Sequence, residues 1–211
     1  MNIKHYMTPD VITIKPDTRV TEAVDLMEKH DFHSLPVIKN DSFVGLITEE
    51  LIKNKTSSAA TSLSIYELNY LLDKTIVEDI MEKDAQTASK ELQIEEAALL
   101  MVDNNITVLP IIDENKKVEG IITYKDIFRA LIELSGYQSK GDRLVIEIDE
   151  DKVGVLDNIT FVLASENISI SHIFVNRIEN RIEITVQISE KIGEKTKKAL
   201  VKAGYETRII T

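Results

Sequence analysis

The chain contains the segment Met7-Thr8-Pro9-Asp10-Val11-Ile12-Thr13 and repeats it in altered form as Met81-Glu82-Lys83-Asp84-Ala85-Gln86-Thr87. The offset of 74 residues (81 − 7) persists along the chain and becomes 75 (120 − 45) after one inserted residue. Repetition of this density predicts two copies of one supersecondary unit. The later matches pair Leu35-Pro36-Val37-Ile38 with Leu109-Pro110-Ile111-Ile112, and Gly45-Leu46-Ile47-Thr48 with Gly120-Ile121-Ile122-Thr123.

Each copy has the pattern of a helix followed by a β-hairpin. Apolar residues recur at the i, i+3, i+4, i+7 spacing of an amphipathic helix from Val20 to Met27, and again from Ile94 to Met101. Two short apolar runs joined by polar residues follow, which predicts paired strands at residues 35–38 and 43–47, and at 109–112 and 118–122. Because each copy has only about 50 residues, we expect the copies to pack together as one domain.

The region between the copies is polar at residues 54–62 and has no periodicity, which predicts a linker. Ser64 and Glu67 then have the spacing of a capping box, so we expect a helix from Ser64 to about Leu72.

The composition excludes several classes of function. The 25 basic and 36 acidic residues of the 211 give a net charge of −11, which disfavours nucleic acid and anionic membranes as partners. The chain has no cysteine, so it has no disulfide, thiolate nucleophile or cysteine-ligated zinc, and its four histidines lack metal-ligand spacing. Without a membrane-length apolar run or a signal-peptide core, we expect a cytoplasmic protein.

A second unit begins after the glycine-containing linker at residues 136–142. Its periodicity predicts the order βαββαβ, with strands near residues 144–148, 168–178, 182–188 and 205–210 and helices at 153–167 and 190–203. Ile182, Ile184, Val186 and Ile188 alternate with polar residues that include Gln187, so one face of the sheet is expected to meet solvent. This order predicts a ferredoxin-like sandwich.

Residues 1–135 resemble the paired CBS domains, or Bateman modules. The resemblance rests on the opening Met-Thr-Pro-Asp-Val, the Leu-Pro-Val strand, and the close Gly120-Ile121-Ile122-Thr123-Tyr124-Lys125-Asp126. It implies an α+β fold with two β-α-β-β-α repeats, at about residues 1–55 and 75–135, that binds adenine nucleotides or related ligands.

The Thr123 and Asp126 pair is the strongest candidate for a binding site. A hydroxyl at the end of a strand and a carboxylate at the start of the next helix can hydrogen-bond to a phosphate and to a ribose diol. The alternative is that Asp126 only caps its helix. The first copy has Leu51 where this carboxylate belongs, with Glu50 as a poor substitute, so that half-site is expected to be empty or weak.

The resemblance implies further nucleotide-binding residues. The adenine base is expected against the opening strands, and the phosphate near the residues that precede the Leu-Pro strand. Because basic residues are scarce there, a monophosphate such as AMP, an adenosine derivative or a cyclic dinucleotide fits better than a triphosphate. The implied residues are Ile12, Thr13, Ala85 and Thr87 for the base, His33, Ser34, Thr107 and Val108 for the phosphate, and Thr48 in the first half-site.

Residues 143–211 resemble the ACT domain, a small-molecule sensing module that commonly binds amino acids and pairs strand to strand. Asp151-Lys152-Val153-Gly154-Val155-Leu156 keeps the glycine and leucine of the family's first turn but has valine in place of proline. The resemblance implies an amino-acid effector near Gly154, Val155 and Leu156, with Asn167 as a further amide donor. The alternatives are that Gly154 only allows helix packing and that Asn167 only ends a helix.

The combination of a CBS pair with an ACT domain resembles the AcuB-type acetoin-utilisation regulatory family. It implies a regulatory protein, with acetoin metabolism as a setting. We expect no cofactor and no catalytic residues, a homodimer because the module faces are exposed, and an unidentified partner protein. An enzyme is disfavoured because the chain lacks Gly-x-Ser-x-Gly, His-Glu-x-x-His and Walker motifs. A structural adaptor with vestigial ligand sites is the alternative function.

Overall fold

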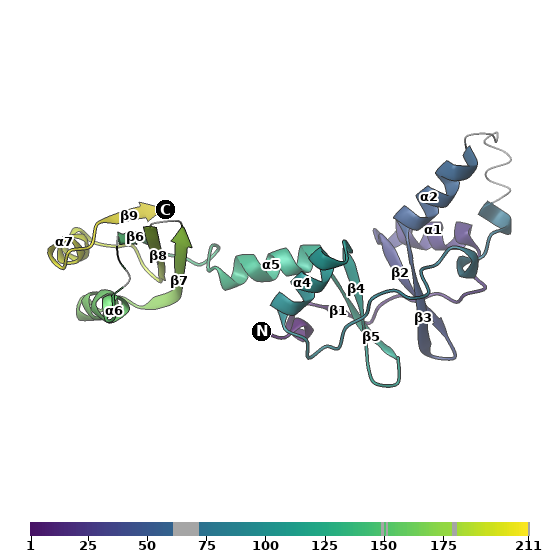
Figure 1. The fold of residues 1–211 in the computed structure, drawn as a ribbon, viewed down its shortest axis with the longest axis horizontal. Coiled ribbons are helices and arrows are strands. Elements are labelled where there is room, and N and C mark those ends of the chain that lie inside the picture. Colours follow the sequence, from purple (N-terminus) through teal and green to yellow (C-terminus); the bar gives the residue numbers. More distant parts are fainter. Residues whose placement is uncertain (61–71, 149, 151, 179–180, 211) are drawn as a thin grey trace. The chain divides into compact units, whose positions relative to one another are not determined.

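The computed structural model describes residues 1–211 except 61–71, 149, 151, 179–180 and 211, and Figure 1 shows its fold. The chain divides into two compact units, Met1–Phe128 and Arg129–Thr211. In the part of the chain that the structure describes, no helix is both long enough and apolar enough to cross a membrane. The two units are described separately below.

The first unit contains two copies of the helix and β-hairpin that the duplication predicts, each followed by a second helix, and the second helix of the second repeat continues past Phe128, where the first unit ends. The helical stripes are buried as expected, at Val20, Ala23 and Met27 in the first repeat and at Ile94, Ala97 and Met101 in the second. The elements of the first repeat are α1 (Val20–His30), β2 (Ser34–Lys39), β3 (Ser42–Thr48) and α2 (Glu49–Ala60), and those of the second are α4 (Ile94–Asp103), β4 (Val108–Ile112), β5 (Val118–Thr123) and α5 (Tyr124–Leu134).

The first hairpin has a two-residue turn. Asn40 and Asp41 both have positive φ angles, 52° and 63°, which is the conformation of a type I′ turn and suits the twist of the paired strands. Asparagine and aspartate tolerate this conformation better than most residues do. The predicted turn is therefore confirmed. It sets Lys39 opposite Ser42, and a register shift between Val37 and Ile38 then places Ser34 opposite Thr48.

The linker prediction for residues 54–62 is wrong over most of its length. Helix α2 continues to Ala60, because polar and small residues are compatible with a helix when one side of its first turns is packed. Ile52 of this helix is buried in the core of the first repeat. The helix expected from Ser64 to about Leu72 lies almost entirely outside the described residues.

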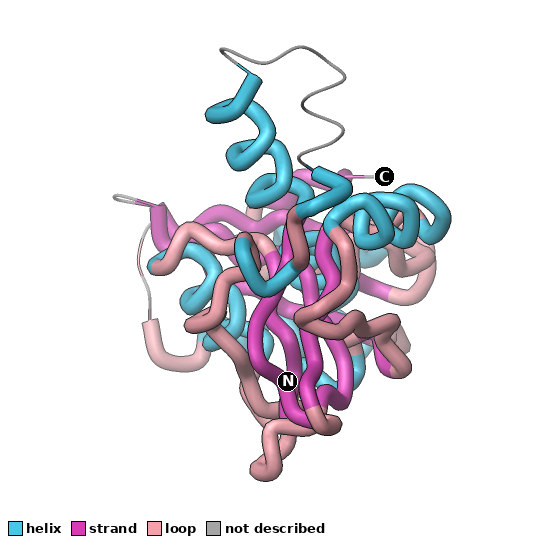
Figure 2. The backbone as a smooth tube through the Cα atoms, turned by 90° about the vertical axis from the view of Figure 1, so that its right-hand side faces the viewer, coloured by secondary structure: helices cyan, strands magenta, loops and turns pink. Residues whose placement is uncertain are grey.

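The second unit has the predicted element order. Its four strands form one antiparallel sheet in the order β7-β8-β6-β9. The core contains Leu144, Ile146, Ile159, Leu163 and Leu200. The elements are β6 (Arg143–Ile148), α6 (Val155–Ser165), β7 (Ile170–Ile178), β8 (Arg181–Ile188), α7 (Glu194–Lys202) and β9 (Thr207–Ile210), and their succession along the backbone can be followed in Figure 2.

Two expectations for the second unit are corrected. Gln187 was expected on the solvent face of β8 but is only 3% exposed, because backbone carbonyls of residues 140 and 142 accept hydrogen bonds from its amide. The last helix begins at Glu194 rather than near residue 190. Before it, the Ile192 N–H donates to the buried carboxylate of Asp142 at 2.8 Å, which holds this segment outside the helix.

The opening segment of each repeat belongs to the sheet of the other repeat. Strand β1 (Thr8–Pro9) pairs with β5, Thr8 opposite Ile121, and Glu82 forms the equivalent bridge to Leu46 of β3. Backbone hydrogen bonds are equivalent in the two repeats. The Ile3 N–H donates to the Leu92 carbonyl oxygen and the Val77 N–H donates to the Thr18 carbonyl oxygen, both at 2.9 Å. The sequence pattern predicts each opening segment within its own copy and does not predict this exchange.

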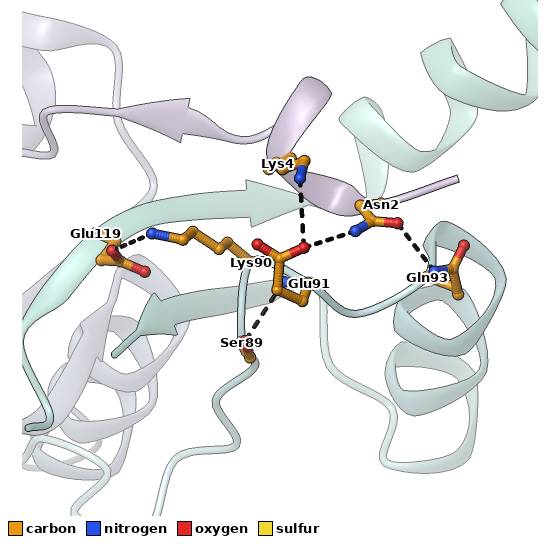
Figure 3. Close-up of polar contacts among 7 residues, drawn as sticks. All are labelled: Asn2, Lys4, Ser89, Lys90, Glu91, Gln93 and Glu119. Atoms are coloured by element: carbon orange, nitrogen blue, oxygen red, sulfur yellow. Dashed lines mark hydrogen bonds and ion pairs between the residues drawn. The ribbon is translucent and has the colours of Figure 1, made fainter. Parts of the chain in front are cut away.

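Buried side chains and exposed polar contacts both hold the exchanged segments. Ile3 and Val77 have no exposed surface, and Val77 lies in the core of the first repeat, so each contributes about 1.5–3 kcal/mol of hydrophobic stabilisation. Figure 3 shows the polar contacts of the first segment: Glu91 accepts hydrogen bonds from Asn2 at 2.8 Å and from Lys4 at 3.3 Å, and Gln93 donates to Asn2. These groups are exposed and stabilise the contact less than the apolar residues do.

Two glycines allow the exchanged segments to lie against the strands. A β-carbon at Gly120 would lie 2.9 Å from the Thr8 carbonyl oxygen and 2.9 Å from the sulfur of Met7. At Gly45 the equivalent distances are 2.8 Å to the Glu82 carbonyl oxygen and 3.0 Å to the sulfur of Met81. The repeated glycine is therefore required by close approach of backbone to backbone.

We expect Gly120→Ala to lower the free energy of unfolding by about 1–3 kcal/mol, because the Thr8 carbonyl cannot move away without breaking the β1–β5 pairing. Denaturant unfolding measures the change, and exposed Glu28→Ala serves as the control. Adding Met7→Ala should not restore stability, since the backbone contact remains. Full rescue by Met7→Ala would contradict this explanation.

Candidate functional site

Thr123 and Asp126 lie in contact at the start of α5. Both the backbone N–H and the hydroxyl of Thr123 donate to Oδ2 of Asp126, at 2.9 and 2.7 Å. Thr123 ends β5 and Asp126 lies in the first turn of the helix, so the carboxylate caps the start of α5 by accepting the N–H of the residue that precedes it. Both side chains are half-buried, so the carboxylate is fixed in position and remains within reach of solvent.

The equivalent position of the first repeat has different chemistry. The Thr48 hydroxyl oxygen accepts a hydrogen bond from the Leu51 N–H at 3.2 Å, where Thr123 donates to a carboxylate in the second repeat. Leu51 instead packs against the core of the first repeat. The two repeats thus offer a carboxylate at one position and an apolar side chain at the other.

A charged cluster that the sequence analysis did not identify lies beside Thr48. Glu49 lies 3.2 Å from Nδ1 of His33 and accepts a hydrogen bond from Lys53 at 3.0 Å. The pKa of the Glu49 carboxyl is lowered, chiefly by the hydrogen bond from Lys53 and then by that from His33. The four-residue spacing of Glu49 and Lys53 was a signal available in the sequence. His33, the one basic residue expected near a phosphate, therefore already has an acidic neighbour.

The remaining predicted residues lie beside the two hairpins. Ser34 pairs with Thr48 in the β2–β3 register, and Val108 pairs with Thr123 in the β4–β5 register. Ile12 and Thr13 lead into Ile14, which bridges to Val37 of β2. Thr107 contributes its carbonyl oxygen, which accepts a hydrogen bond from the Tyr124 N–H at 3.0 Å.

The structure places Ala85 and Thr87 apart from β5. They lead into Ala88, which bridges to Ile111 on one edge of β4, while β5 pairs with the other edge. Two strand spacings, or about 10 Å, therefore separate this segment from the strand that carries Thr123. A molecule the length of a nucleotide can span that distance, but a single hydrogen bond cannot.

Two depressions lie at equivalent places in the two repeats. The first, of about 500 Å³, is lined by residues that include Lys15, Asp17 and Asp41, and the second, of about 480 Å³, by residues that include Thr87 and Glu119. Thr123 and Asp126 line neither of these two depressions. No group of three or more potential metal ligands occurs among the residues that the structure describes.

In the second unit, the predicted effector residues lie at opposite ends of α6. Gly154 precedes the helix with a φ angle of 93°, Val155 begins it, and Leu156 is 42% exposed. Asn167 follows the helix with a φ angle of 60° and is exposed. Because 11 helical residues span about 16 Å, one small amino acid does not reach both ends.

Two proteins of one archaeon have sequences similar to part of this chain. Inosine-5'-monophosphate dehydrogenase of Methanocaldococcus jannaschii is 35% identical over 139 residues, which are 65% of this chain and 25% of that enzyme. Protein MJ1225 of the same organism is 34% identical over 128 residues, or 60% of this chain and 46% of that protein. The chain therefore matches less than half the length of these two relatives.

Several solved structures share the fold. The CBS domain pair of protein MJ0100, in complex with 5'-methylthioadenosine and S-adenosyl-L-methionine, has a TM-score of 0.54 and 25% identity, and the match covers 62% of this chain and 99% of that one. CBSX2 in complex with AMP has a TM-score of 0.52 and 26% identity, and the match covers 63% of this chain and 96% of that one. An acetoin utilization protein (AcuB) of Vibrio cholerae, described as putative, has a TM-score of 0.54 and 22% identity, and the match covers 65% of this chain and 95% of that one. This similarity shows a shared fold and nothing further.

The family model described as "CBS domain" matches residues 3–55 and 77–133, which correspond to the two repeats and include both exchanged segments. The repeats, their exchanged strands and this match lead to one conclusion: the chain belongs to the CBS domain family and carries a pair of these domains.

Proposed function

We propose that the chain is a non-catalytic regulatory sensor that binds an adenosine-containing molecule at its CBS pair, with Asp126 accepting hydrogen bonds from the ribose. The observation that carries the proposal is the fixed Thr123 and Asp126 pair at the start of α5. It is supported by the two solved CBS pairs whose ligands are AMP, 5'-methylthioadenosine and S-adenosylmethionine. In this proposal the protein acts in the cytoplasm.

The charges near the candidate residues favour a ligand with at most one phosphate. His33 is engaged by Glu49, and the other implied base and phosphate residues are neutral: Ile12, Thr13, Ser34, Ala85, Thr87 and Thr107. Compared with a monophosphate, a triphosphate would bring two further phosphate groups and their negative charge without matching donors. AMP and uncharged or cationic adenosine derivatives are therefore the proposed ligand class.

The difference between the repeats favours one ligand per chain. The half-site at Thr48 has Leu51 in place of a carboxylate. A ribose placed there would lose its acceptor. The half-site at Thr123 offers that acceptor in Asp126.

Isothermal calorimetry with AMP tests the proposal. We expect binding of about one AMP per chain, and a loss of about tenfold to a hundredfold in affinity for Asp126→Asn, since one charge-assisted hydrogen bond is removed while size is kept. Glu50→Gln is the matched control and should bind as the wild type does. Equal affinity for AMP in Asp126→Asn would refute the assigned role of Asp126.

The first half-site offers the converse experiment. Leu51→Asp should raise the stoichiometry of AMP from one to two, because it restores the carboxylate at the position equivalent to Asp126. Leu51→Asn is the control, since it loses the same apolar packing without gaining a charge. If Leu51→Asp and Leu51→Asn bind AMP alike, the carboxylate is not what distinguishes the two half-sites.

A structural role is the second candidate function, and one observation favours it. Oδ2 of Asp126 already accepts two hydrogen bonds from Thr123, so the residue caps α5 without a ligand. A protein that serves only as an adaptor would lose thermal stability in Asp126→Asn but would show no change in melting temperature on addition of AMP. A sensor would show both effects.

We further propose that residues 143–211 form an ACT domain, joined by the segment 136–142 to a CBS domain pair at 1–135, in a homodimer of the AcuB type. The βαββαβ order and the sheet order β7-β8-β6-β9 support it. An amino acid is the proposed effector, bound at the Gly154 end of α6. Acetoin metabolism is the proposed setting, and the regulated partner is a protein.

Gly154→Ala tests this part of the proposal. Nothing lies within 4 Å of a β-carbon at this position, but the φ angle of 93° is unfavourable for alanine, so we expect a loss of about 1–2 kcal/mol in unfolding free energy. Gly193→Ala is the control, because that glycine has equal space and a φ angle of −80°. Calorimetry with the twenty amino acids should detect one that binds the wild type and not Gly154→Ala.

A further inference from the structure

The sulfur atoms of the chain all belong to its five methionines. Because the chain has no cysteine, methionine is the residue whose sulfur a peroxide can oxidise. Four of the five occupy equivalent positions in the two repeats, at the offset of 74 residues: Met7 corresponds to Met81, and Met27 corresponds to Met101. The fifth is Met1, which is 48% exposed.

The two pairs of methionines differ in their access to solvent. Met27 on α1 is 2% exposed and Met101 on α4 is 5% exposed, so both are protected by the core. Met7 and Met81 are half-buried. An oxidant dissolved in water therefore reaches the second pair before the first, and each repeat carries one accessible and one protected methionine.

Met7 and Met81 lie directly against the two glycines that admit the exchanged segments. A β-carbon at Gly120 would lie 2.9 Å from the sulfur of Met7 and 3.3 Å from its terminal methyl group. A β-carbon at Gly45 would lie 3.0 Å from the sulfur of Met81 and 3.3 Å from its Cγ. Each thioether thus fills the space that a side chain on the facing strand would otherwise occupy.

Each of these methionines also immediately precedes the residue that joins the two repeats. Thr8 pairs with Ile121. Glu82 exchanges two backbone hydrogen bonds with Leu46, both at 2.9 Å. A change in the packing of either thioether therefore acts on the neighbouring backbone pairing.

A sulfoxide does not fit these two positions as a thioether does. Oxidation converts a flexible apolar side chain into a polar one. The glycine Cα atoms offer no strong hydrogen-bond donor, and the N–H groups of Leu46 and Glu82 already donate to each other's carbonyl oxygens. The added oxygen either stays unpaired against the strand or turns the side chain out to solvent, and both outcomes weaken the contact.

We propose that Met7 and Met81 are a pair of reversible oxidation sites, at which hydrogen peroxide loosens the exchange of opening segments between the repeats. The sulfur forms a bond to one peroxide oxygen as the O–O bond breaks, so the thioether loses two electrons and the other oxygen leaves as water. In the reverse reaction, a methionine sulfoxide reductase oxidises two thiols to a disulfide and releases the oxygen as water. The inference requires no nucleotide and does not rest on the proposed function.

The test treats the full chain with hydrogen peroxide and follows each methionine by peptide mass spectrometry. We expect Met7 and Met81 to be oxidised at least about tenfold faster than Met27 and Met101, because the core excludes the oxidant from the second pair. Oxidation should lower the melting temperature by about 5 °C. It should also raise hydrogen exchange about threefold in peptides covering residues 1–9 and 77–83, and reductases for both sulfoxide epimers should reverse both changes.

The double variant Met7→Leu with Met81→Leu shows whether these two sulfurs are responsible. Leucine keeps an apolar side chain of similar volume and has no sulfur, so peroxide should leave the melting temperature of this variant unchanged. Met1→Leu is the matched control and should lose stability on oxidation as the wild type does. If the double variant does not fold, the full chain with norleucine in place of methionine makes the same comparison.

Three results would overturn the proposal. The first is oxidation of Met7 and Met81 at the rate of Met27 and Met101. The second is complete oxidation of Met7 and Met81 with no change in melting temperature. The third is an equal loss of stability in the double variant and in the wild type. Because none of these measurements uses AMP, failure of AMP to bind would contradict the proposed function and leave this test intact.

Discussion

The exchange of opening segments between the two repeats is the constraint on which the first unit depends. Ile3 and Val77 are fully buried, and backbone bonds in equivalent pairs fix their segments to the other repeat. Gly45 and Gly120 make this possible, because any side chain there would meet a carbonyl oxygen of the incoming strand. The hairpins that carry Thr48 and Thr123 therefore have positions set by both halves of the duplication.

On this symmetrical frame the two half-sites have diverged. The same turn from strand to helix holds Thr48 and Leu51 in one repeat and Thr123 and Asp126 in the other. The backbone does not require a carboxylate at this position, since the first repeat begins its helix without one. The first repeat instead places Glu49, next to Thr48, in contact with His33 and Lys53.

Local structure could be predicted from the sequence, and contacts between distant segments could not. Periodicity located the helices that begin at Val20 and Ile94 and the hairpins that follow them, because these patterns reflect burial of one face. The alignment of the repeats could not show that Thr8 pairs with Ile121 rather than with its own copy, since both choices satisfy the same pattern. Gln187 was misplaced for a similar reason: alternation marks it as solvent-facing, but its amide lies against the backbone of Lys140 and Asp142, which are distant in the sequence.

The exchange also governs how the chain can acquire its structure during synthesis. When the first repeat has emerged from the ribosome, Val77 and the bridge residue Glu82, which complete its core and sheet, have not yet emerged. The first repeat therefore stays incomplete until the opening segment of the second repeat has emerged.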